Sequence, residues 1–287
     1  MPARGAVRNR APPGKVAPDM DWTVLGWSAL AVAVVMLATW LASVPLRNAS
    51  VVDPVWPLGF VVVGWTAGLV GRGDTLRVVL LVALVTIWGV RLSWHLFSRN
   101  WNQEEDFRYA AMRERWGDRF WIVSLVTVFA TQGLLMWVVS LPLQLGAGID
   151  GRGFAWPVLL VLGVAVWVLG FVFEAVGDAQ LKAFKADPAN KGEVMDDGLW
   201  RYTRHPNYFG DACVWWGLYL VATGAGGWAW AAVVGPVVMT TLLRRVSGVT
   251  LLEKDMAERR PGYTDYVRRT SPFVPRPPRE PSRGSSH

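Results

Sequence analysis

The sequence predicts an all-α, polytopic membrane protein with about seven transmembrane helices around a cytoplasm-facing cavity. Three observations support this fold class. Of the 287 residues, 52% are hydrophobic and 18 are Trp. Apolar stretches of the ~20 residues that a helix needs to cross a bilayer recur along the chain. Lys and Arg gather between these stretches, as is typical of loops on the cytoplasmic side.

The expected elements follow from these apolar stretches. Membrane-spanning helices are predicted at residues 22–43, 54–71, 75–97, 121–145, 155–177, 207–226 and 228–247. The basic, Pro-rich residues 1–20 lack the compact apolar core and cleavage site of a signal peptide, so we expect a retained, disordered tail. Residues 273–287 are rich in Pro, Arg and Ser and cannot form a core. One transmembrane domain, residues 21–272, is expected between the two tails.

The loop charges favour an outer N-terminus and a cytoplasmic C-terminus. In that orientation the inner loops 44–53, 98–120 and 178–206 hold one, five and five basic residues, whereas the outer loops hold three in total. The basic N-terminal tail is the exception. We therefore expect an integral protein of a bacterial inner membrane. Because this bias accounts for the net charge of +7, no nucleic-acid partner is expected.

Metal and disulfide chemistry are not expected. The single cysteine, Cys213, excludes an internal disulfide and a Cys-based zinc site. The only histidines are His95, His205 and His287, too few for a multi-histidine site. The GxGxxG pattern at 146–151 follows no strand and so lacks the context of a dinucleotide-binding fold.

The fifth predicted span ends with ionisable residues on one helical stripe: Glu174, Asp178, Lys182 and Lys185. Such residues at membrane depth cost at least ~2.5 kcal/mol each on insertion scales, so they need partners or a function. One interpretation is a ladder of salt bridges within the helix, with Asp178 bonded to Lys182. The other is a polar cavity. Glu174 lies deepest and has no cation one turn away, which favours the cavity.

The stretch GLWRYTRHPNYFGD, residues 198–211, concentrates polar side chains in an apolar chain. Pro206 suits the first turn of a helix, whose free backbone N–H groups attract anions. Asn207 and Asp211 lie one turn apart on one face. The other polar side chains are Arg201, Arg204, His205 and Tyr208. Together they predict a site for a phosphate-bearing cofactor; alternatively, the arginines bind lipid head groups and Asn207 and Asp211 bond to neighbouring helices.

Two further places carry candidate polar groups. Asp53 precedes Pro54 and is either a cap at the membrane interface or a carboxyl group that opens into the cavity and supplies a proton. Arg91, His95 and Arg99 share one stripe of the third span. A histidine in such a position is more often a hydrogen-bonded structural residue than a catalyst.

The motif DGLWRYTRHPNYFGD, with EAVGDAQLKAFK before it and YTDYVRRTSPFVP after it, resembles the DUF1295 family, from about residue 53 to 275. That family belongs to the steroid 5-alpha-reductase-like superfamily of membrane reductases. The resemblance implies a seven-helix fold that binds NADPH in a cytoplasm-facing cavity. The motif is also similar to that of sterol C14 and delta-7 reductases. A related Arg-His-Pro-x-Tyr motif occurs in isoprenylcysteine methyltransferases, which bind S-adenosylmethionine.

The resemblance also assigns residues. It implies cofactor contacts at Glu174, Asp178, Lys185, Arg201, Arg204, His205, Asn207, Tyr208, Asp211 and Glu253. Lys182 is a further cofactor-binding candidate, because it, Lys185, Arg201 and Arg204 are cations that could hold a 2′-phosphate. Steroid reductases hold the substrate ketone with a Tyr and a Glu. Here the Tyr position falls near Trp88, which has no phenolic proton, and the Glu corresponds to Asp53. The substrate therefore need not be a 3-oxo steroid.

The function expected from these features is that of an NADPH-dependent oxidoreductase of lipid metabolism. It would reduce an enone-type C=C bond of a lipophilic substrate, such as a steroid or isoprenoid, with Asp53 or Tyr109 as the proton donor. A methyltransferase that uses S-adenosylmethionine and a non-catalytic membrane protein are the alternatives. The oligomeric state is left open.

Overall fold

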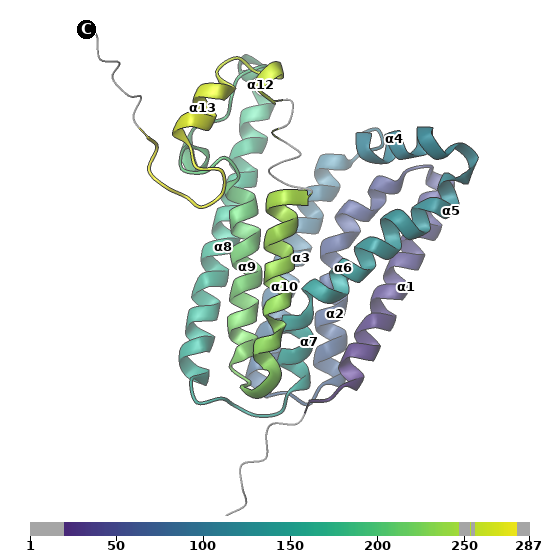
Figure 1. Cartoon of the computed structure of the whole chain (residues 1–287), viewed down its shortest axis with the longest axis vertical. Helices are drawn as coiled ribbons and strands as arrows, with labels where there is room; N and C mark the ends of the chain where they lie inside the picture. Colours follow the sequence, from purple (N-terminus) through teal and green to yellow (C-terminus); the bar gives the residue numbers. More distant parts are fainter. Residues whose placement is uncertain (1–19, 247–252, 254–255, 280–287) are drawn as a thin grey trace, which may run out of the picture.

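The computed structural model describes residues 20–246, 253 and 256–279, so the predicted tail at 1–20 lies almost wholly outside the described residues. This part of the chain is a helical bundle without a β-strand (Figure 1). Two isolated bridges, Met20 to Ile149 and Thr203 to Ser271, are its only β-type pairings. The predicted all-α class is confirmed.

Six helical segments of the described chain are long and apolar enough to cross a membrane: Thr23–Leu46, Ala49–Val70, Thr75–Asn100, Phe107–Val139, Trp156–Ala186 and Gly227–Arg245. The protein is thus an integral, multi-pass membrane protein. The predicted span 207–226 forms helix α9, Pro206–Thr223, which is not among the six. Its first turns carry Asn207, Tyr208 and Asp211, and these polar residues lower its hydropathy.

The spans begin with α1 (Thr23–Leu46), α2 (Val52–Val70) and α3 (Thr75–Asn100). The fourth contains α4 (Phe107–Trp116), α5 (Phe120–Ser124), a π-helical segment (Leu125–Ala130) and α6 (Thr131–Val139). Helix α4 lies across one end of the bundle, within the predicted inner loop (Figure 1).

The predicted span 121–145 does not continue as one helix. It ends at Ser140, and α7 (Leu141–Gly148) follows with Pro142 in its first turn. The break is explained by Pro142, which has no N–H to continue the preceding helix.

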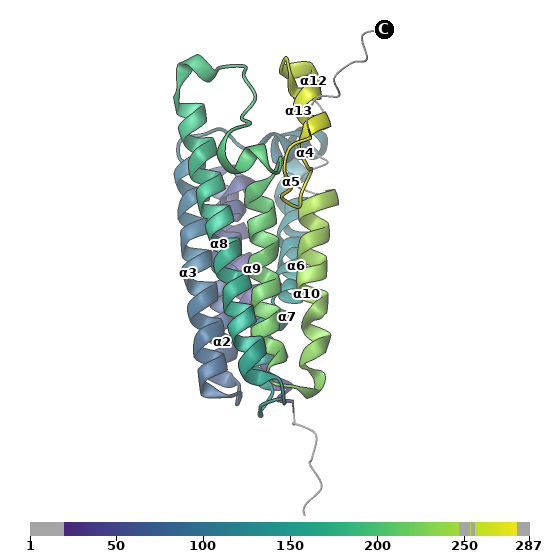
Figure 2. The same ribbon diagram turned by 90° about the vertical axis from the view of Figure 1, so that its left-hand side faces the viewer.

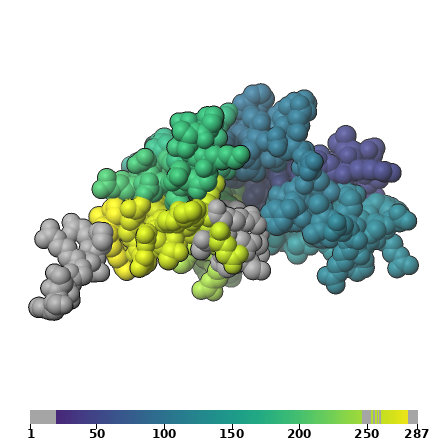
Figure 3. All heavy atoms as spheres, turned by 90° about the horizontal axis from the view of Figure 1, so that it is seen from above, coloured from purple at the N-terminus to yellow at the C-terminus, as the bar shows by residue number. Residues whose placement is uncertain are grey.

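The second half of the bundle is built on α8 (Trp156–Ala186), α9 and α10 (Val234–Thr241). Helix α8 extends nine residues beyond the predicted end at 177, so Asp178, Lys182 and Lys185 do lie on a helix. A C-terminal arm contains α12 (Met256–Arg259) and α13 (Tyr263–Arg269) and runs to residue 279. Viewed from above, the arm lies beside the α8–α9 connection and apart from the α4 region (Figure 3).

Residues 273–279 differ from the predicted disorder. Phe273 is buried and Arg276 donates its backbone N–H to the carbonyl of Tyr202 at 3.0 Å. The composition of this segment forbids a core of its own, but it is held on the surface of the bundle. Residues 280–287 lie outside the described part of the chain.

Helices α8 and α9 are antiparallel and lie side by side in both views (Figures 1 and 2). A glycine seam, Gly163 and Gly170 of α8 against Gly210 and Gly217 of α9, brings their backbones into contact. A Cβ on Gly170 would lie 2.5 Å from the Gly210 carbonyl oxygen, and one on Gly217 would lie 2.7 Å from that of Gly163. Small residues allow such close approach between membrane helices. The seam therefore holds the polar residues of α8 beside those of α9.

An aromatic core supports this pair from the side of α2 and α3. The rings of Trp88 and Trp215 pack edge to face at 5.5 Å, and Phe60 contacts Trp215 at 4.6 Å. All three side chains are fully buried. Because such ring packing adds to area burial, this core fixes α3 against α9.

Candidate functional site

A cavity of about 380 Å³ lies where α2, α3, α4, α6, α8, α9 and α10 converge. Its volume is within the range of small-molecule sites, roughly 300–1,000 Å³. The apolar part of its wall includes Trp56, Leu92, Leu96, Leu135, Met239 and Leu243. The polar part consists of Asp53, His95, Arg99, Arg108, Tyr109, Gln132, Glu174, Asp178, Asn207, Tyr208 and Asp211. The cavity can therefore take a ligand with both apolar and polar groups.

The α8 wall is organised by one guanidinium from α3. Arg91 donates to Glu174 Oε1 at 2.9 Å and to Asp178 Oδ2 at 2.7 Å. Trp88 donates its indole N–H to the other oxygen of Glu174 at 2.9 Å. The cation that Glu174 needs thus comes from another helix. Asp178 pairs with Arg91 and Asn207, and no described hydrogen bond joins it to Lys182, so the predicted ladder within α8 is not formed.

The α9 wall adds an amide and a third carboxylate. Asn207 donates from Nδ2 to Asp178 Oδ1 at 3.1 Å, which joins the two helices. Asp211 is buried, and its Oδ1 has no hydrogen-bond partner within the described residues. A buried acceptor without a donor is costly, roughly 1–3 kcal/mol, so Oδ1 requires a donor, either a ligand group or the nearby indole N–H of Trp215, which is also unpaired. The wall has three carboxylates and one neutralising guanidinium.

The opposite wall carries the two predicted proton donors. The hydroxyl of Tyr109 on α4 donates to Asp53 Oδ1 on α2 at 3.0 Å. Gln132 of α6 donates to the same hydroxyl oxygen at 3.2 Å, and Arg108 Nη2 lies 3.7 Å from Asp53 Oδ2. Asp53 therefore opens into the cavity instead of serving only as a cap. The structure brings this pair into one cavity with Asp178, Asn207 and Asp211.

Arg204, His205 and Glu253 do not line the cavity and contact one another. Arg204 binds both oxygens of Glu253, at 2.8 and 3.0 Å, and His205 Nε2 lies 2.8 Å from Glu253 Oε1. Burial alone would raise the pKa of Glu253, but the hydrogen bonds from His205 and Arg204 outweigh it and lower the pKa to about 2. This triad clamps the C-terminal region to the start of α9. The described contacts of these three residues are with protein groups.

The triad still reaches the cavity through Tyr208. The His205 ring stacks on the Tyr208 ring at 5.5 Å with an interplanar angle of 6°. Tyr208 lines the cavity. His205 thus orients a residue of the wall.

The three other basic candidates lie outside the cavity. Lys182 and Lys185 are exposed on the last turns of α8. Arg201 is exposed and lines a separate hollow with Asp196 and Asp197. Their proposed contacts with phosphate stay predictions.

Sequence reasoning missed four contributors to this site: Arg91, His95, Arg108 and Gln132. His95 lines the cavity, and its Nε2 lies 3.7 Å from Asp178 Oδ2. Gln132 is an isolated amide within an apolar span, a signal that could have been used. The sequence places Arg91 and His95 on one face of α3, but their spacing does not predict that this face packs against α8. No group of three or more potential metal ligands occurs in the part of the chain that was described.

Comparisons with known proteins give a family and distant relatives. A sequence profile of DUF1295, a family described as proteins of unknown function, matches residues 39–270. The uncharacterized protein C594.04c of Schizosaccharomyces pombe is 26% identical over 276 aligned residues, which cover 83% of this chain and 75% of that protein. The probable O-methyltransferase ustE of Ustilaginoidea virens is 41% identical over 49 residues, 17% of each chain. No solved structure matches significantly.

Proposed function

This chain belongs to the DUF1295 family, and from that membership and the cavity we propose that it is an NADPH-dependent membrane reductase. The substrate would be lipophilic, of steroid or isoprenoid type, with an enone-type C=C bond. One observation carries the proposal: a single cavity joins the carboxylate wall of α8 and α9 to the Tyr109–Asp53 pair. In this proposal the α4 end of the bundle faces the cytoplasm of a bacterium.

The cavity residues fit a nicotinamide nucleotide. Asp211 Oδ1 is a buried acceptor that needs a donor, such as an amide or a ribose hydroxyl. Asn207 and Tyr208, on the same helix, offer further polar contacts. Arg99 lies on the cavity wall and is exposed, so it can meet a phosphate at the rim. These four residues would hold the cofactor, which when bound supplies a hydride.

The Tyr109–Asp53 pair would act on the substrate. Addition of hydride at the β-carbon of an enone places negative charge on the carbonyl oxygen, and a proton completes the reduction. Tyr109, hydrogen-bonded to Asp53 at 3.0 Å, would donate a proton to the enolate oxygen or to the α-carbon, and Asp53 would hold the donor in place or supply the proton in its stead. Gln132 and Arg108 hold the pair from two sides. Stabilisation of developing charge by such preorganised groups is usually the largest catalytic contribution.

The apolar wall would select the substrate. Trp56, Leu135, Met239 and Leu243 face the same space as the proton-donating pair. They favour a lipophilic substrate body and exclude water from the reacting atoms. The mixed wall therefore fits an apolar molecule that carries one polar group.

Methyl transfer is the second candidate, favoured by the likeness of 49 residues to the probable O-methyltransferase ustE. The sulfonium of S-adenosylmethionine is cationic, and so is an oxidised nicotinamide ring. The carboxylates of Glu174, Asp178 and Asp211 complement either charge. The charge of the wall therefore does not separate the two reactions.

Ligand-induced thermal stabilisation of the detergent-purified protein separates them. We expect NADPH to raise the melting temperature and S-adenosylmethionine to leave it unchanged. Asn207→Ala should abolish the shift, whereas Asn190→Ala, outside the cavity, should keep it. Stabilisation by S-adenosylmethionine alone would contradict the reductase proposal and support a methyltransferase. Stabilisation by neither would favour a non-catalytic protein.

A further inference from the structure

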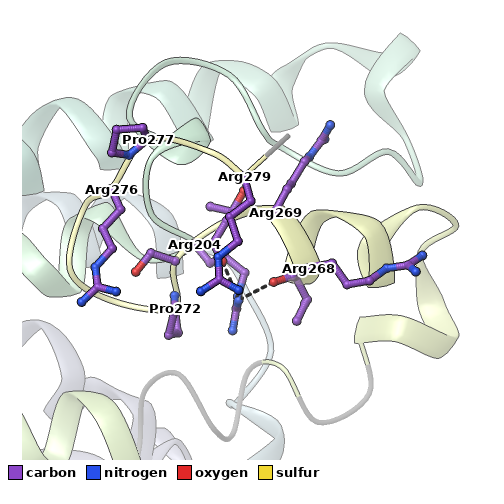
Figure 4. Close-up of a pocket in the computed structure, with 10 residues that line it drawn as sticks. Arg204, Arg268, Arg269, Pro272, Arg276, Pro277 and Arg279 are labelled. Carbon is purple, nitrogen blue, oxygen red and sulfur yellow. Dashed lines mark hydrogen bonds between the residues drawn. The ribbon is translucent and has the colours of Figure 1, made fainter. Parts of the chain in front are cut away.

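A second hollow, of about 220 Å³, lies under the C-terminal arm and shares no lining residue with the cavity (Figure 4). Five arginines line it: Arg204, Arg268, Arg269, Arg276 and Arg279. Val267, Pro277 and residues 270–272 complete the wall. The reductase proposal makes no use of this hollow.

Backbone hydrogen bonds fix the shape of the hollow. Arg204 donates to the carbonyl of Ser271 at 2.9 Å, and Arg279 donates to that of Arg269 at 2.9 Å. The Thr203 hydroxyl donates to the carbonyl of Phe273 at 2.8 Å. Four prolines at 272, 275, 277 and 278 restrict the intervening backbone. The arginines therefore project from a preformed frame.

The hollow has more positive charge than its partners neutralise. Arg204 is paired with Glu253, Arg268 with Asp265 and Arg269 with Asp196. No described ion pair includes Arg276 or Arg279. In Figure 4 the side chain of Arg279 extends beside Arg204 and that of Arg276 extends in the same direction. Because these arginines line one hollow, their like charges favour an anion there.

The arm as a whole has the same imbalance. Residues 256–279 contain six Arg and two acidic residues, a formal charge of 6 − 2 = +4. Val267 and Val274 are exposed at 37% and 49% beside these arginines. Mixed basic and apolar exposure is typical of segments that lie at a membrane interface. The arm is at the end of the bundle where α8 ends and α9 begins (Figure 2).

We infer that this hollow binds the phosphate of an anionic phospholipid, with Arg276 and Arg279 as its principal ligands. A guanidinium donates two parallel N–H bonds to phosphate oxygens, which suits both free arginines. Each basic residue next to an anionic membrane surface strengthens binding about fivefold. A soluble phosphate offers the same chemistry, so the test must separate the two sources. The inference is independent of the reductase proposal.

Native mass spectrometry of the full chain with added lipid tests the inference. Wild type should retain phosphatidylglycerol in preference to phosphatidylcholine, and R276Q/R279Q should bind phosphatidylglycerol about 25-fold more weakly. R115Q/R119Q is the matched control, because it removes two exposed arginines from the end of the bundle that carries α4. Its affinity should stay within about twofold of wild type, because Arg115 and Arg119 do not line the hollow. An unchanged melting temperature checks that each variant is folded.

Three results would overturn the inference. The first is equal retention of the two lipids by wild type, and the second is unchanged retention by R276Q/R279Q. The third is an equal loss in both double variants, which would reflect net charge alone. Inorganic phosphate is the remaining probe. If it stabilises wild type but not R276Q/R279Q and there is no preference for phosphatidylglycerol, the ligand is a soluble phosphate and the lipid assignment fails.

Discussion

Arg91 of α3 binds Glu174 of α8 at 2.9 Å, and the same guanidinium reaches Asp178 at 2.7 Å. Glu174 is 2% exposed, so its charge has little contact with solvent. One cation from a neighbouring helix therefore compensates two carboxylates that lie one turn apart. The cavity wall depends on this contact as much as on the helix that carries the acids.

Arg91→Gln should destabilise the protein strongly. Removal of one member of a buried ion pair leaves uncompensated charge and typically costs about 3–5 kcal/mol. Arg72→Gln is the control, because Arg72 is 84% exposed and lies 3.7 Å from Asp21. An exposed pair contributes about 0–1 kcal/mol. Thermal unfolding of both variants in detergent measures the difference, and equal losses would contradict a structural role for the Arg91 bridge.

Tyr109→Phe should reduce kcat by a factor of about 10² to 10⁴, because a positioned proton donor contributes that much. The affinity for the cofactor should change little, since Tyr109 lies on the wall opposite Asn207 and Asp211. Asp53→Asn should have a similar effect, because the two groups share one hydrogen bond. Steady-state kinetics and cofactor titration give both quantities. Tyr219→Phe, outside the cavity, is the control, and a kcat equal to wild type in Tyr109→Phe would exclude this donor.

Asp211→Asn should weaken binding of NADP⁺ more than binding of NADPH. Only the oxidised nicotinamide carries a positive charge, and the wall has three carboxylates for one guanidinium. The ratio of the two dissociation constants should change by about tenfold, or ~1.4 kcal/mol. Calorimetric titration of both forms measures it. Asp118→Asn, an exposed change outside the cavity, should leave the ratio constant. An equal loss for both forms in Asp211→Asn would show that its charge is not near the ring.

Gly210→Ala should disrupt the α8–α9 contact. The new Cβ would lie 2.4 Å from the backbone nitrogen of Glu174 and 2.5 Å from the Gly170 carbonyl oxygen, so one helix must move. Such overpacking costs about 1–3 kcal/mol or more. In Gly26→Ala, on α1, the added Cβ has no atom within 4 Å, so that variant should be neutral or slightly stabilised. The melting temperatures of the two variants test the close backbone contact between α8 and α9. A melting temperature of Gly210→Ala close to that of wild type would contradict this contact.

Acid should release the clamp between Glu253 and the start of α9. The pKa of Glu253 is lowered from its ordinary 4.5 to about 2, so the folded state favours the ionised carboxylate. This contribution to stability is complete above pH 4.5 and is lost as the pH falls through 2. The difference in unfolding free energy between wild type and Glu253→Gln should therefore shrink between pH 5 and pH 2. A difference that is constant with pH would contradict the assigned cause.

The fold class could be predicted because it depends on the number and length of the apolar stretches. The polar half of the site could be predicted because ionisable residues are rare within membrane-spanning stretches. Asp178, Asn207, Asp211, Asp53 and Tyr109, which the polar pattern and the family resemblance singled out, line one cavity, while their roles in it stay predictions. The ion pairing could not be predicted. The spacing within α8 suggests Lys182 as the partner of Asp178, but the observed partner, Arg91, comes from α3.

The predicted role of Arg204 illustrates a second limit of sequence reasoning. A cation beside a helix N-terminus suits an anionic ligand, but an acid from a distant part of the chain competes for it. Glu253 lies 49 residues further along the chain and binds that guanidinium. Such contacts depend on how the C-terminal region packs against the start of α9, and the local sequence pattern around Arg204 does not predict that packing.

The glycine contact between α8 and α9 has a consequence for how this scaffold can change. Because the two backbones touch, neither helix can slide or rotate without a collision, so the α8–α9 half of the cavity behaves as a fixed block. The facing half comes from α2, α4, α6 and α10, and its side chains Trp56, Leu135 and Met239 do not belong to the glycine contact. The shape of the cavity can therefore change through the side chains of one half, while the α8–α9 half stays as it is.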